Sequence, residues 1–342
     1  MSATLEETIE AENELETKPT TPATATASPL EKRSYTWAIG GGKGGVGKSL
    51  ISANLSITLA QTGARVTAVD LDLGCANLHT CLGVDIPSLT LSDFFSKRID
   101  DMNNVIIPTS IRNLNLISGA QDSIGVANLK HTQKSKLLEQ LNKVNSDYLL
   151  FDLGAGTSFN TLDFFLSADV GILVVLPEPT SIENTYRFIK SAYYRKLKVA
   201  DSLFEIRPLI DMAMDQKNTL GIRSPADLLR EAAKYSPEIA NKLREEIRQF
   251  KPKLIINQAR TQSDIDIGFS IKSVCKKYFG IDVDYIGYLD YDSAVWQSVR
   301  RKKPVCIEFP NSKLSSTFQK ITRHLLQEQK DQQKAGTAFA QP

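Results

Sequence analysis

A glycine-rich segment near the N-terminus constrains the fold of this chain more than any other part of its sequence. It reads Gly-Gly-Gly-Lys-Gly-Gly-Val-Gly-Lys-Ser over residues 40–49, after an apolar run at Thr36–Ile39 and before a helical pattern over 49–61. Because glycine tolerates positive φ angles, consecutive backbone N–H groups in such a segment can turn toward a single anion. The sequence therefore predicts a strand–loop–helix unit that binds phosphate.

Two nucleotide-binding patterns fit this loop. Gly40, Gly42 and Gly45 match the dinucleotide fingerprint G-x-G-x-x-G. Asp70, at the end of the next predicted strand, stands where an acid would bind a ribose. Residues 42–49 also match the phosphate-binding loop G-x-x-x-x-G-K-S.

The lysine and serine that end the loop favour the second pattern. A dinucleotide pyrophosphate is held mostly by backbone N–H groups and needs no fixed lysine. Lys48 and Ser49, in contrast, stand where a lysine reaches the β- and γ-phosphates and a hydroxyl binds Mg²⁺. We therefore predict that the loop binds a nucleoside triphosphate with Mg²⁺. The predicted phosphate-binding residues are Gly42, Lys43, Gly44, Gly45, Val46, Gly47, Lys48 and Ser49.

Short apolar runs alternate with helical patterns through the rest of the chain. This alternation predicts βα units and hence a three-layer α/β fold, with a mainly parallel sheet and helices on both faces. The predicted strands are Thr36–Ile39, Val66–Leu71, Leu114–Ile117, Tyr148–Phe151, Gly171–Leu176, Leu254–Asn257 and Tyr285–Gly287. The predicted helices lie near 49–61, 134–144, 160–167, 181–197, 264–278, 292–302 and 313–327.

Composition and charge divide the chain into one domain and two tails. Residues 1–33 carry seven acidic and three basic groups, and their Thr-, Ala- and Pro-rich run predicts disorder. Residues 34–326 form the predicted domain, in which a charged helical stretch at 200–250 is interpreted as an insertion that covers the sheet. Residues 327–342 are expected to form a polar C-terminal tail.

Composition also excludes several classes of protein. Hydrophobic residues make up 42% of the chain and charged residues 23%, as is typical of a globular protein. The longest apolar run, Gly171–Leu176, is far shorter than the roughly 20 residues of a membrane-spanning helix, so no integral membrane segment is expected. The N-terminus lacks the basic residues of a signal peptide, and the cysteines and histidines lack metal-ligand spacing. These features predict a cytoplasmic protein.

Three aspartates stand at the ends of predicted strands. Asp70 and Asp72 end one strand, and Asp152 ends another. Side chains alternate along a strand, so Asp70 and Asp72 are expected to point the same way. Because ligands of parallel sheets bind beyond the carboxyl ends of the strands, all three aspartates are expected beside the loop.

Lys43 is a second lysine inside the loop, which an ordinary phosphate-binding loop does not require. The sequence Lys43-Gly-Gly-Val-Gly-Lys-Ser49 resembles the deviant Walker A motif of the MinD/ParA family, and residues 152–156 and 177–180 resemble its MinD/FlhG-like branch. The resemblance implies a SIMIBI-type P-loop NTPase fold and a homodimer that closes around ATP. In that family the first lysine reaches the phosphates of the partner subunit, so Lys43 would stabilise charge in trans, as an arginine finger does.

The same resemblance implies roles for the acidic residues. The stretch Asp70–Gly74 is similar to the first switch of the family, in which Asp72 would orient or deprotonate the attacking water and Asp70 would support the Mg²⁺ shell. Tyr148–Asp152 resembles a Walker B strand, whose aspartate holds Mg²⁺ beside the Ser49 hydroxyl. A turn cap is the alternative role for Asp70 or Asp72. The implied catalytic residues are Lys43, Lys48 and Asp72, and the implied metal-binding residues are Ser49, Asp70 and Asp152.

Two further residues would contact the nucleoside. Asn257 matches an asparagine that in this family reads the edge of adenine, since an amide both donates and accepts hydrogen bonds. Asp290 matches an aspartate that lies near the base and ribose, although a strand-end aspartate also commonly caps a turn.

The resemblance implies an ATP-dependent molecular switch that binds and slowly hydrolyses Mg-ATP. It would control spatial positioning or regulation, such as the cell-division site, flagellar placement or number, or partition of cargo or DNA. The alternative is a non-catalytic, ATP-dependent binding module, such as a FleN-like transcription-factor antagonist.

Three kinds of partner would fit such a switch. The first is an activating protein partner. The second is peripheral contact with the inner membrane through a basic amphipathic helix, although the same apolar stripe is also typical of a last helix docked on the core. The third is nonspecific contact with the DNA of the nucleoid through surface lysines and arginines. The stripe consists of Leu314, Phe318, Ile321 and Leu325, and the candidate DNA-binding residues are Arg187, Lys190, Arg195, Lys196, Lys198, Arg300, Arg301, Lys302 and Lys303.

Overall fold

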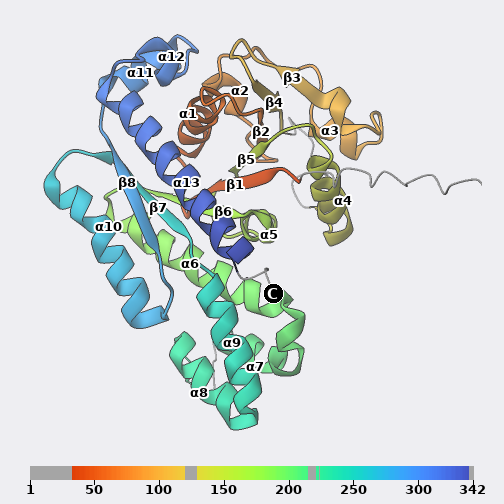
Figure 1. Cartoon of the computed structure of the whole chain (residues 1–342), viewed down its shortest axis with the longest axis vertical. Coiled ribbons are helices and arrows are strands. Elements are labelled where there is room, and N and C mark those ends of the chain that lie inside the picture. Colours follow the sequence, from red (N-terminus) through yellow and green to blue (C-terminus); the bar gives the residue numbers. More distant parts are fainter. Residues whose placement is uncertain (1–32, 120–128, 215–220, 223, 339–342) are drawn as a thin grey trace, which may run out of the picture. The chain divides into compact units, whose positions relative to one another are not determined.

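An eight-stranded sheet is the centre of the fold (Figure 1). The computed structural model describes residues 33–119, 129–214, 221–222 and 224–338, so the expected N-terminal tail lies outside the described residues except for Arg33. The strand order is β3-β4-β2-β5-β1-β6-β7-β8, and every neighbouring pair is parallel except β3 with β4. The predicted α/β fold with a mainly parallel sheet is confirmed. The strands are β1 (Tyr35–Gly40), β2 (Val66–Leu71), β3 (Ile106–Pro108), β4 (Leu114–Ile117), β5 (Tyr148–Leu153), β6 (Val170–Val175), β7 (Lys253–Ala259) and β8 (Asp284–Asp290).

Helices cover both faces of the sheet. On one face, α1 and α13 pack against the sheet through a cluster that includes Leu55 and Phe318. On the other face, α5, α6 and α10 contribute to a second cluster that includes Phe165, Phe188 and Ile271. The helices are α1 (Lys48–Ala60), α2 (Leu78–Cys81), α3 (Leu91–Phe95), α4 (His131–Asn142), α5 (Phe159–Ser167), α6 (Pro179–Val199), α7 (Arg207–Met214), α8 (Pro225–Tyr235), α9 (Pro237–Gln249), α10 (Gln262–Val274), α11 (Ser293–Arg300), α12 (Val305–Glu308) and α13 (Lys313–Ala338).

The central strands are buried along almost their whole length because both of their sides are covered. Every residue of β2 is buried, and only the first residue of β5 is partly exposed. Such continuous burial is typical of parallel strands in α/β proteins. The register pairs Asp70 of β2 and Ile39 of β1 with Asp152 of β5, so the ends of these strands meet at one edge of the sheet. This edge positions the site described below.

The described residues of the stretch 200–250 are mostly helical. Ser224 and Asp227 form a capping box at the start of α8, and Ser236 accepts hydrogen bonds from the first turn of α9. These caps satisfy backbone N–H groups that have no partner within the helix. An ion pair between Lys196 of α6 and Glu246 of α9 joins this stretch to the sheet-covering helix.

The fold differs from the sequence-based expectation in its shortest elements and in its C-terminal segment. The short strand β3 and the helices α2, α3 and α12 are not predicted, because they are too short to show a hydrophobic period. The polar composition after residue 326 predicts a tail, whereas α13 continues unbroken to Ala338. Glu328 pairs with buried Lys253, and the Tyr148 hydroxyl donates to Gln329 at 2.8 Å. This part of the segment is therefore attached to the domain.

The apolar stripe of α13 belongs to the core. Leu314, Phe318, Ile321 and Leu325 are each at most 3% exposed and pack in the same cluster as α1. Side chains buried in this way are not available to insert into a lipid surface, so the structure supports the other role predicted for this stripe, that of a last helix docked on the core. Among the described helices, none has the length and apolar character that crossing a membrane requires.

The core position of α13 predicts a stability effect. Leu325→Ala is expected to lower the free energy of unfolding by about 2–5 kcal/mol, because it leaves a cavity between α13 and the sheet. Ile86→Ala is the matched control, since Ile86 is 76% exposed and its loss should cost less than about 0.5 kcal/mol. Urea unfolding followed by circular dichroism measures both values, and equal values would contradict the docked position of α13.

Candidate functional site

The glycine-rich loop joins the end of β1 to the start of α1. Gly47 precedes α1 with φ 94°, a left-handed conformation that disfavours any residue with a side chain. Gly42 lies so close to α6 that a Cβ atom there would be 2.2 Å from the carbonyl oxygen of Asn184. Glycine is therefore needed at Gly47, where the backbone turns, and at Gly42, where it passes close to α6. The resulting loop directs the start of α1 toward the edge of the sheet where the strands end.

Lys48, Ser49 and Asp152 come together at the start of α1, as expected from the sequence. Asp152 is 1% exposed, and its carboxylate accepts a hydrogen bond from Ser52 at 2.9 Å and another from Ser49. Lys48 is also buried, and burial lowers its pKa, although the nearby charges of Asp152 and Asp72 act in the opposite direction. A hydroxyl and a carboxylate on neighbouring elements are oxygen ligands of the kind that Mg²⁺ prefers. Ser49 and Asp152 therefore fit the expected metal site.

Burial sets the proton affinity of Asp152. Loss of contact with water raises the pKa of its carboxyl to about 6, despite the hydrogen bonds from Ser49 and Ser52 and the charge of Lys48. A bound cation would favour the ionised form and lower this pKa. A divalent ion would therefore stabilise this group of oxygen ligands.

Asp70 uses both carboxylate oxygens for the backbone. One oxygen accepts from the N–H of Leu78 at 3.0 Å, at the start of α2, and the other from the N–H of Asp72 at 3.1 Å. Burial and the charge of Asp152 hold the pKa of Asp70 well above its usual range. The geometry supports the alternative role, that of a cap, and Asp70 fixes the segment that follows β2.

Asp72 lies beyond the end of β2 and is half-buried. Its carboxylate accepts from the N–H of Cys75 at 3.2 Å. A Cβ atom at Gly154 would be 3.3 Å from the same carboxylate, so the segment after β5 passes close to Asp72. The segment that carries Asp72 and the segment that follows β5 therefore lie side by side.

Lys43 is held by residues that sequence reasoning did not select. Its Nζ donates to Glu178 at 3.3 Å and to Thr180 at 3.2 Å. Both residues follow β6, where Thr180 lies in the first turn of α6. Lys43 remains 39% exposed and Glu178 53% exposed, so the pair lies at the surface beside the loop. The motif Pro-Glu-Pro-Thr at 177–180 is the only sequence feature that could have indicated this contact.

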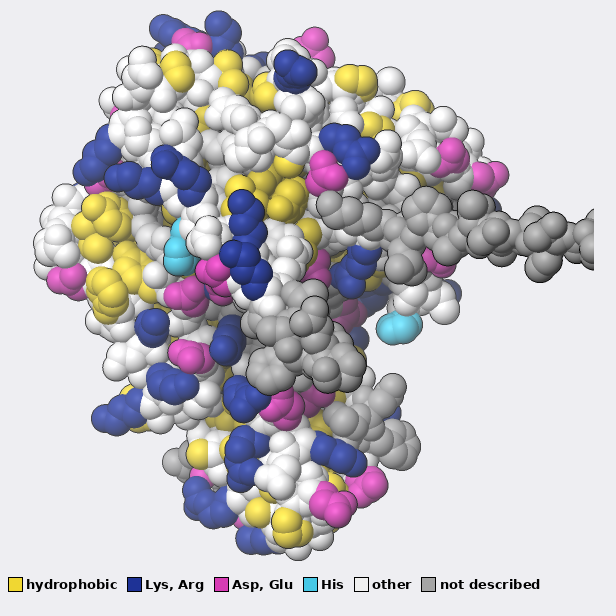
Figure 2. All heavy atoms as spheres, in the orientation of Figure 1, with side chains coloured by type: hydrophobic (Ala, Val, Ile, Leu, Met, Phe, Trp, Pro, Cys, Tyr) yellow, Lys and Arg dark blue, Asp and Glu magenta, His cyan; other side chains and the backbone are white. Residues whose placement is uncertain are grey.

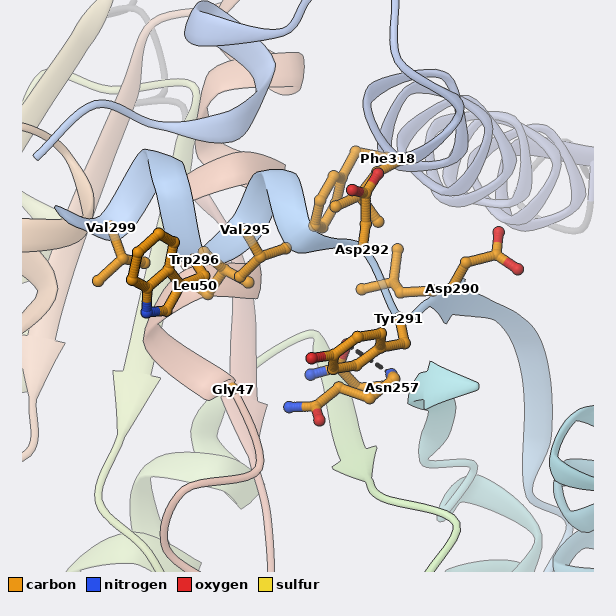
Figure 3. A pocket seen from close by; sticks show the side chains of 13 residues that line it. Gly47, Leu50, Asn257, Asp290, Tyr291, Asp292, Val295, Trp296, Val299 and Phe318 are labelled. Carbon is orange, nitrogen blue, oxygen red and sulfur yellow. Dashed lines mark hydrogen bonds between the residues drawn. The ribbon is translucent and has the colours of Figure 1, made fainter. Parts of the chain in front are cut away.

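A largely apolar cavity of about 320 Å³ adjoins Gly47 (Figure 3). Asn257 and Asp290 both line it, as expected for residues near a nucleoside. Asp290 is paired with Lys313 of α13 at 3.0 Å. Tyr291 and Trp296, which also line the cavity, are 54% and 62% exposed. Exposed aromatic rings around an apolar cavity favour a flat ligand such as a nucleobase.

An arginine covers each of these aromatic rings. The guanidinium of Arg260 lies 4.0 Å from the centroid of the Tyr291 ring, and that of Arg300 lies 4.9 Å from Trp296. Contact with a cation orients an aromatic ring. The sequence patterns did not identify these aromatic residues.

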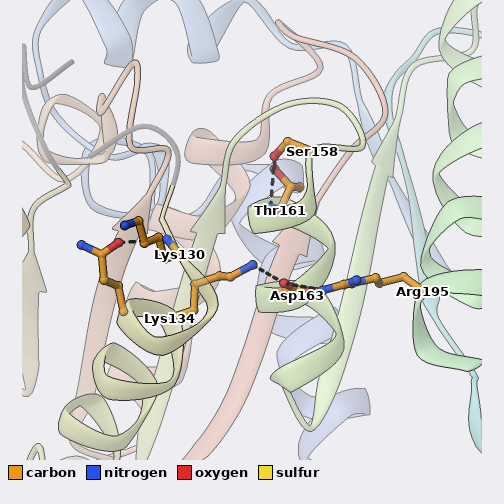
Figure 4. A network of polar contacts seen from close by, with 7 residues as sticks. Lys130, Lys134, Ser158, Thr161, Asp163 and Arg195 are labelled. Carbon is orange, nitrogen blue, oxygen red and sulfur yellow. Dashed lines mark hydrogen bonds and ion pairs between the residues drawn. The ribbon is translucent and has the colours of Figure 1, made fainter. Parts of the chain in front are cut away.

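A network of polar contacts fixes α5, the helix that follows the Gly154–Gly156 segment (Figure 4). Asp163 of α5 accepts from Arg195 of α6 at 2.7 Å and 3.1 Å and pairs with Lys134 of α4. Burial alone would raise the pKa of Asp163, but the hydrogen bonds from Arg195 and Lys134 lower it. At the start of α5, Ser158 caps the helix by accepting from the N–H of Thr161. The segment beside Asp72 therefore leads into an anchored helix.

The raised pKa of Asp152 predicts how stability depends on pH. Between the ordinary pKa near 4 and about 6, the folded ligand-free protein holds a proton that the unfolded chain has lost, so stability falls as pH rises through this range. Asp152→Asn is expected to raise the free energy of unfolding at pH 7.5 by roughly 2–3 kcal/mol, and by less at pH 5. It should also abolish stabilisation by Mg²⁺ with nucleotide. Urea unfolding at both pH values measures the change.

Asp163→Asn is the matched control for this prediction and should act in the opposite direction. The ionised Asp163 is stabilised by two cations, so its loss should lower the free energy of unfolding at pH 7.5. A stability loss for Asp152→Asn at pH 7.5 would contradict the account of the buried carboxyl.

Comparison with known proteins agrees with this geometry. A ParA family model, described as NUBPL iron-transfer P-loop NTPase, matches residues 33–201. The antiactivator FleN of Pseudomonas aeruginosa is 27% identical over 287 residues, 84% of each chain. The flagellum site-determining protein YlxH of Helicobacter pylori is 33% identical over 53% of this chain and 60% of its own length. The septum site-determining protein MinD of the same organism is 33% identical over 43% of this chain and 55% of its own length.

Solved structures share the fold. The septum site-determining protein MinD of Pyrococcus horikoshii, solved with Mg-ADP, superposes with a TM-score of 0.58 at 24% identity, over 85% of this chain and 96% of that chain. The cell division ATPase MinD of Pyrococcus furiosus superposes with a TM-score of 0.58 at 22% identity, over 86% of this chain and 99% of that chain. The loop with two lysines, the aspartates at the strand ends and these likenesses agree: the chain belongs to the ParA/MinD family of P-loop NTPases.

Proposed function

We propose that this protein is an ATP-dependent switch that forms a homodimer around bound nucleotide and slowly hydrolyses Mg-ATP. The observation that carries the proposal is the pair of lysines in one loop. Lys48 is buried beside Asp152, whereas Lys43 lies at the surface, bonded to Glu178 and Thr180. A surface lysine beside the phosphate loop is available to a second copy of the chain.

Each site residue has a role in this proposal. Lys48 binds the β- and γ-phosphates, and Ser49 and Asp152 hold Mg²⁺, which neutralises charge on the phosphate oxygens. Asp72 accepts a proton from, or orients, the water that attacks the γ-phosphate. Lys43 leaves Glu178 and places its ammonium group against the phosphates of the partner subunit. Asp70 holds the segment that carries Asp72, and Asp290 and Asn257 lie beside the base.

The relatives suggest what such a switch controls. The names of FleN and YlxH refer to antiactivation and to flagellum site determination, and that of MinD to the septum site. Of these three, FleN aligns over the largest share of both chains. We therefore propose that the switch acts in the cytoplasm and regulates flagellar number or placement. Selection of the division site and partition of cargo are other functions that a positioning switch of this kind could serve.

Six of the nine candidate DNA-binding residues already pair with carboxylates. Of the basic residues on α6, Arg195, Lys196 and Lys198 pair with carboxylates of Asp163, Glu246 and Asp211, and Arg187 pairs with Glu183. Arg301 and Lys303 likewise share Glu308. Cations already paired with carboxylates contribute less to phosphate binding. We infer that an activating protein partner, rather than nonspecific DNA, responds to the nucleotide state.

A second candidate function is a non-catalytic, ATP-dependent binding module. The relative that favours it is the antiactivator FleN, which aligns over 84% of each chain. Such a module would act through nucleotide binding alone. The two candidates differ in whether hydrolysis is needed to end the active state.

Asp72→Ala separates binding from hydrolysis. It is expected to bind Mg-ATP and dimerise while its turnover falls by about 10²–10⁴, because the attacking water loses its orienting group. Phosphate release and sedimentation velocity with ATP measure the two properties. Lys48→Ala is the control and should neither bind ATP nor dimerise. A monomeric Asp72→Ala protein with normal turnover would refute the role of Asp72, and a variant that acts as wild type in cells would favour the non-catalytic module.

Glu178→Gln tests whether Lys43 is released when the dimer forms. In the wild type, the Lys43–Glu178 ion pair of each subunit must break when the dimer forms, and each such surface pair is worth roughly 0.2–1 kcal/mol. The variant lacks both pairs, so its dimer dissociation constant with a non-hydrolysable ATP analogue should fall about 2- to 30-fold. Sedimentation equilibrium measures this constant. Glu183→Gln is the matched control, since Glu183 lies on the same helix, is 63% exposed and pairs with Arg187 instead. A weaker dimer for Glu178→Gln would contradict the release of Lys43.

A further inference from the structure

Asn257 makes two side-chain hydrogen bonds, one to the phosphate loop and one to the backbone of the next residue. Its Nδ2 donates to the carbonyl oxygen of Val46 at 2.8 Å, and its Oδ1 accepts from the N–H of Gln258 at 2.9 Å. The side chain is 4% exposed although it lines the cavity beside the loop. These two bonds fix the carboxamide in one orientation.

The bond to Val46 acts on the peptide group that leads into α1. The Val46 carbonyl and the Gly47 N–H belong to the same planar trans peptide and point in opposite directions. A donor that holds the carbonyl therefore also fixes the direction of the Gly47 N–H. That N–H lies at the N-terminus of α1, where free N–H groups bind anions.

The fit between Asn257 and the loop is close. A Cβ atom at Gly47 would lie 2.4 Å from Nδ2 of Asn257, so the left-handed glycine leaves room for the carboxamide. Val46 is itself 1% exposed. At this point the loop therefore rests against the end of β7, where the pairing of β7 with β8 is interrupted between Ile256 and Ala259.

We propose that Asn257 is a positioning residue for the phosphate loop: it holds the Val46–Gly47 peptide so that the start of α1 binds the triphosphate whatever base is attached. This inference rests on the proposed nucleotide binding and deepens it. It differs from a base-reading role, in which the same side chain would discriminate adenine from other bases. The two roles give opposite results when the base is changed or removed.

The experiment compares three ligands on the full chain: Mg-ATP, Mg-GTP and Mg-tripolyphosphate, which has no base. Asn257→Leu preserves much of the side-chain volume and removes both hydrogen bonds, and Asn257→Ala removes the volume as well. Isothermal titration should show all three ligands bound about tenfold more weakly by both variants, with the ratio of ATP to GTP affinity unchanged. Loss of ATP affinity with unchanged tripolyphosphate affinity would overturn the proposal in favour of base reading.

A second measurement needs no ligand. Hydrogen exchange of the ligand-free protein should become faster at residues 47–49 in Asn257→Leu, while exchange in the sheet stays as in the wild type. Unchanged exchange at these residues would overturn the proposal. Gln262→Ala is the matched control: this carboxamide lies on α10, is exposed and bonds to Asp266 rather than to the loop. It should leave both measurements unchanged.

The same titrations distinguish failure of this inference from failure of the proposed function. A wild-type protein that binds none of the three ligands would refute nucleotide binding itself. A wild-type protein that binds ATP, with variants that lose only the preference for adenine, would refute the positioning role alone.

Discussion

The burial of negative charge where β2 and β5 end is the constraint on which the site depends. Asp70 and Asp152 are register partners on neighbouring strands, and both are withdrawn from water. Burial raises the pKa of each, and the charge of Asp152 raises that of Asp70 further. Lys48 and the N-terminus of α1 offset part of this cost. A divalent cation beside Asp152 would offset more of it, so the ligand-free site is an electrostatically unfavourable arrangement that such a cation would relieve.

The fold makes this arrangement tolerable by separating stability from function. Apolar clusters on both faces of the sheet supply the stabilising contacts, while the strand ends at one edge carry the polar groups. Asp70 is satisfied by two backbone N–H groups, and Asp152 by two hydroxyls. Loss of either set would leave a buried acceptor without a partner, which costs free energy. The protein therefore needs Asp70 and Ser52 to build the site, even where they do not touch phosphate.

Much of the fold could be predicted from the sequence, because parallel strands buried on both sides are continuous apolar runs. The glycine-rich loop likewise predicts its own position between β1 and α1. The sequence could not show which side chain forms a hydrogen bond or ion pair with which buried or charged group. Asp70 caps α2, Glu178 holds Lys43, and Asn257 holds the Val46 carbonyl. These contacts join residues distant in sequence, and no local period or motif reveals them. The polar composition of residues 327–338 likewise gave no indication that Glu328 and Gln329 contact Lys253 and Tyr148.

The length of α6 has a mechanical consequence. This helix has 21 residues and spans roughly 30 Å. At its first turns it touches the loop, through Thr180 and through the backbone of Asn184 behind Gly42. Near its last turn, Arg195 and Lys196 are tied to α5 and α9. A helix is stiff along its axis, so a shift of the loop at one end is transmitted as a tilt at the other. Helix α9 is thereby coupled, through Lys196 and Glu246, to movements of the glycine-rich loop at the other end of α6.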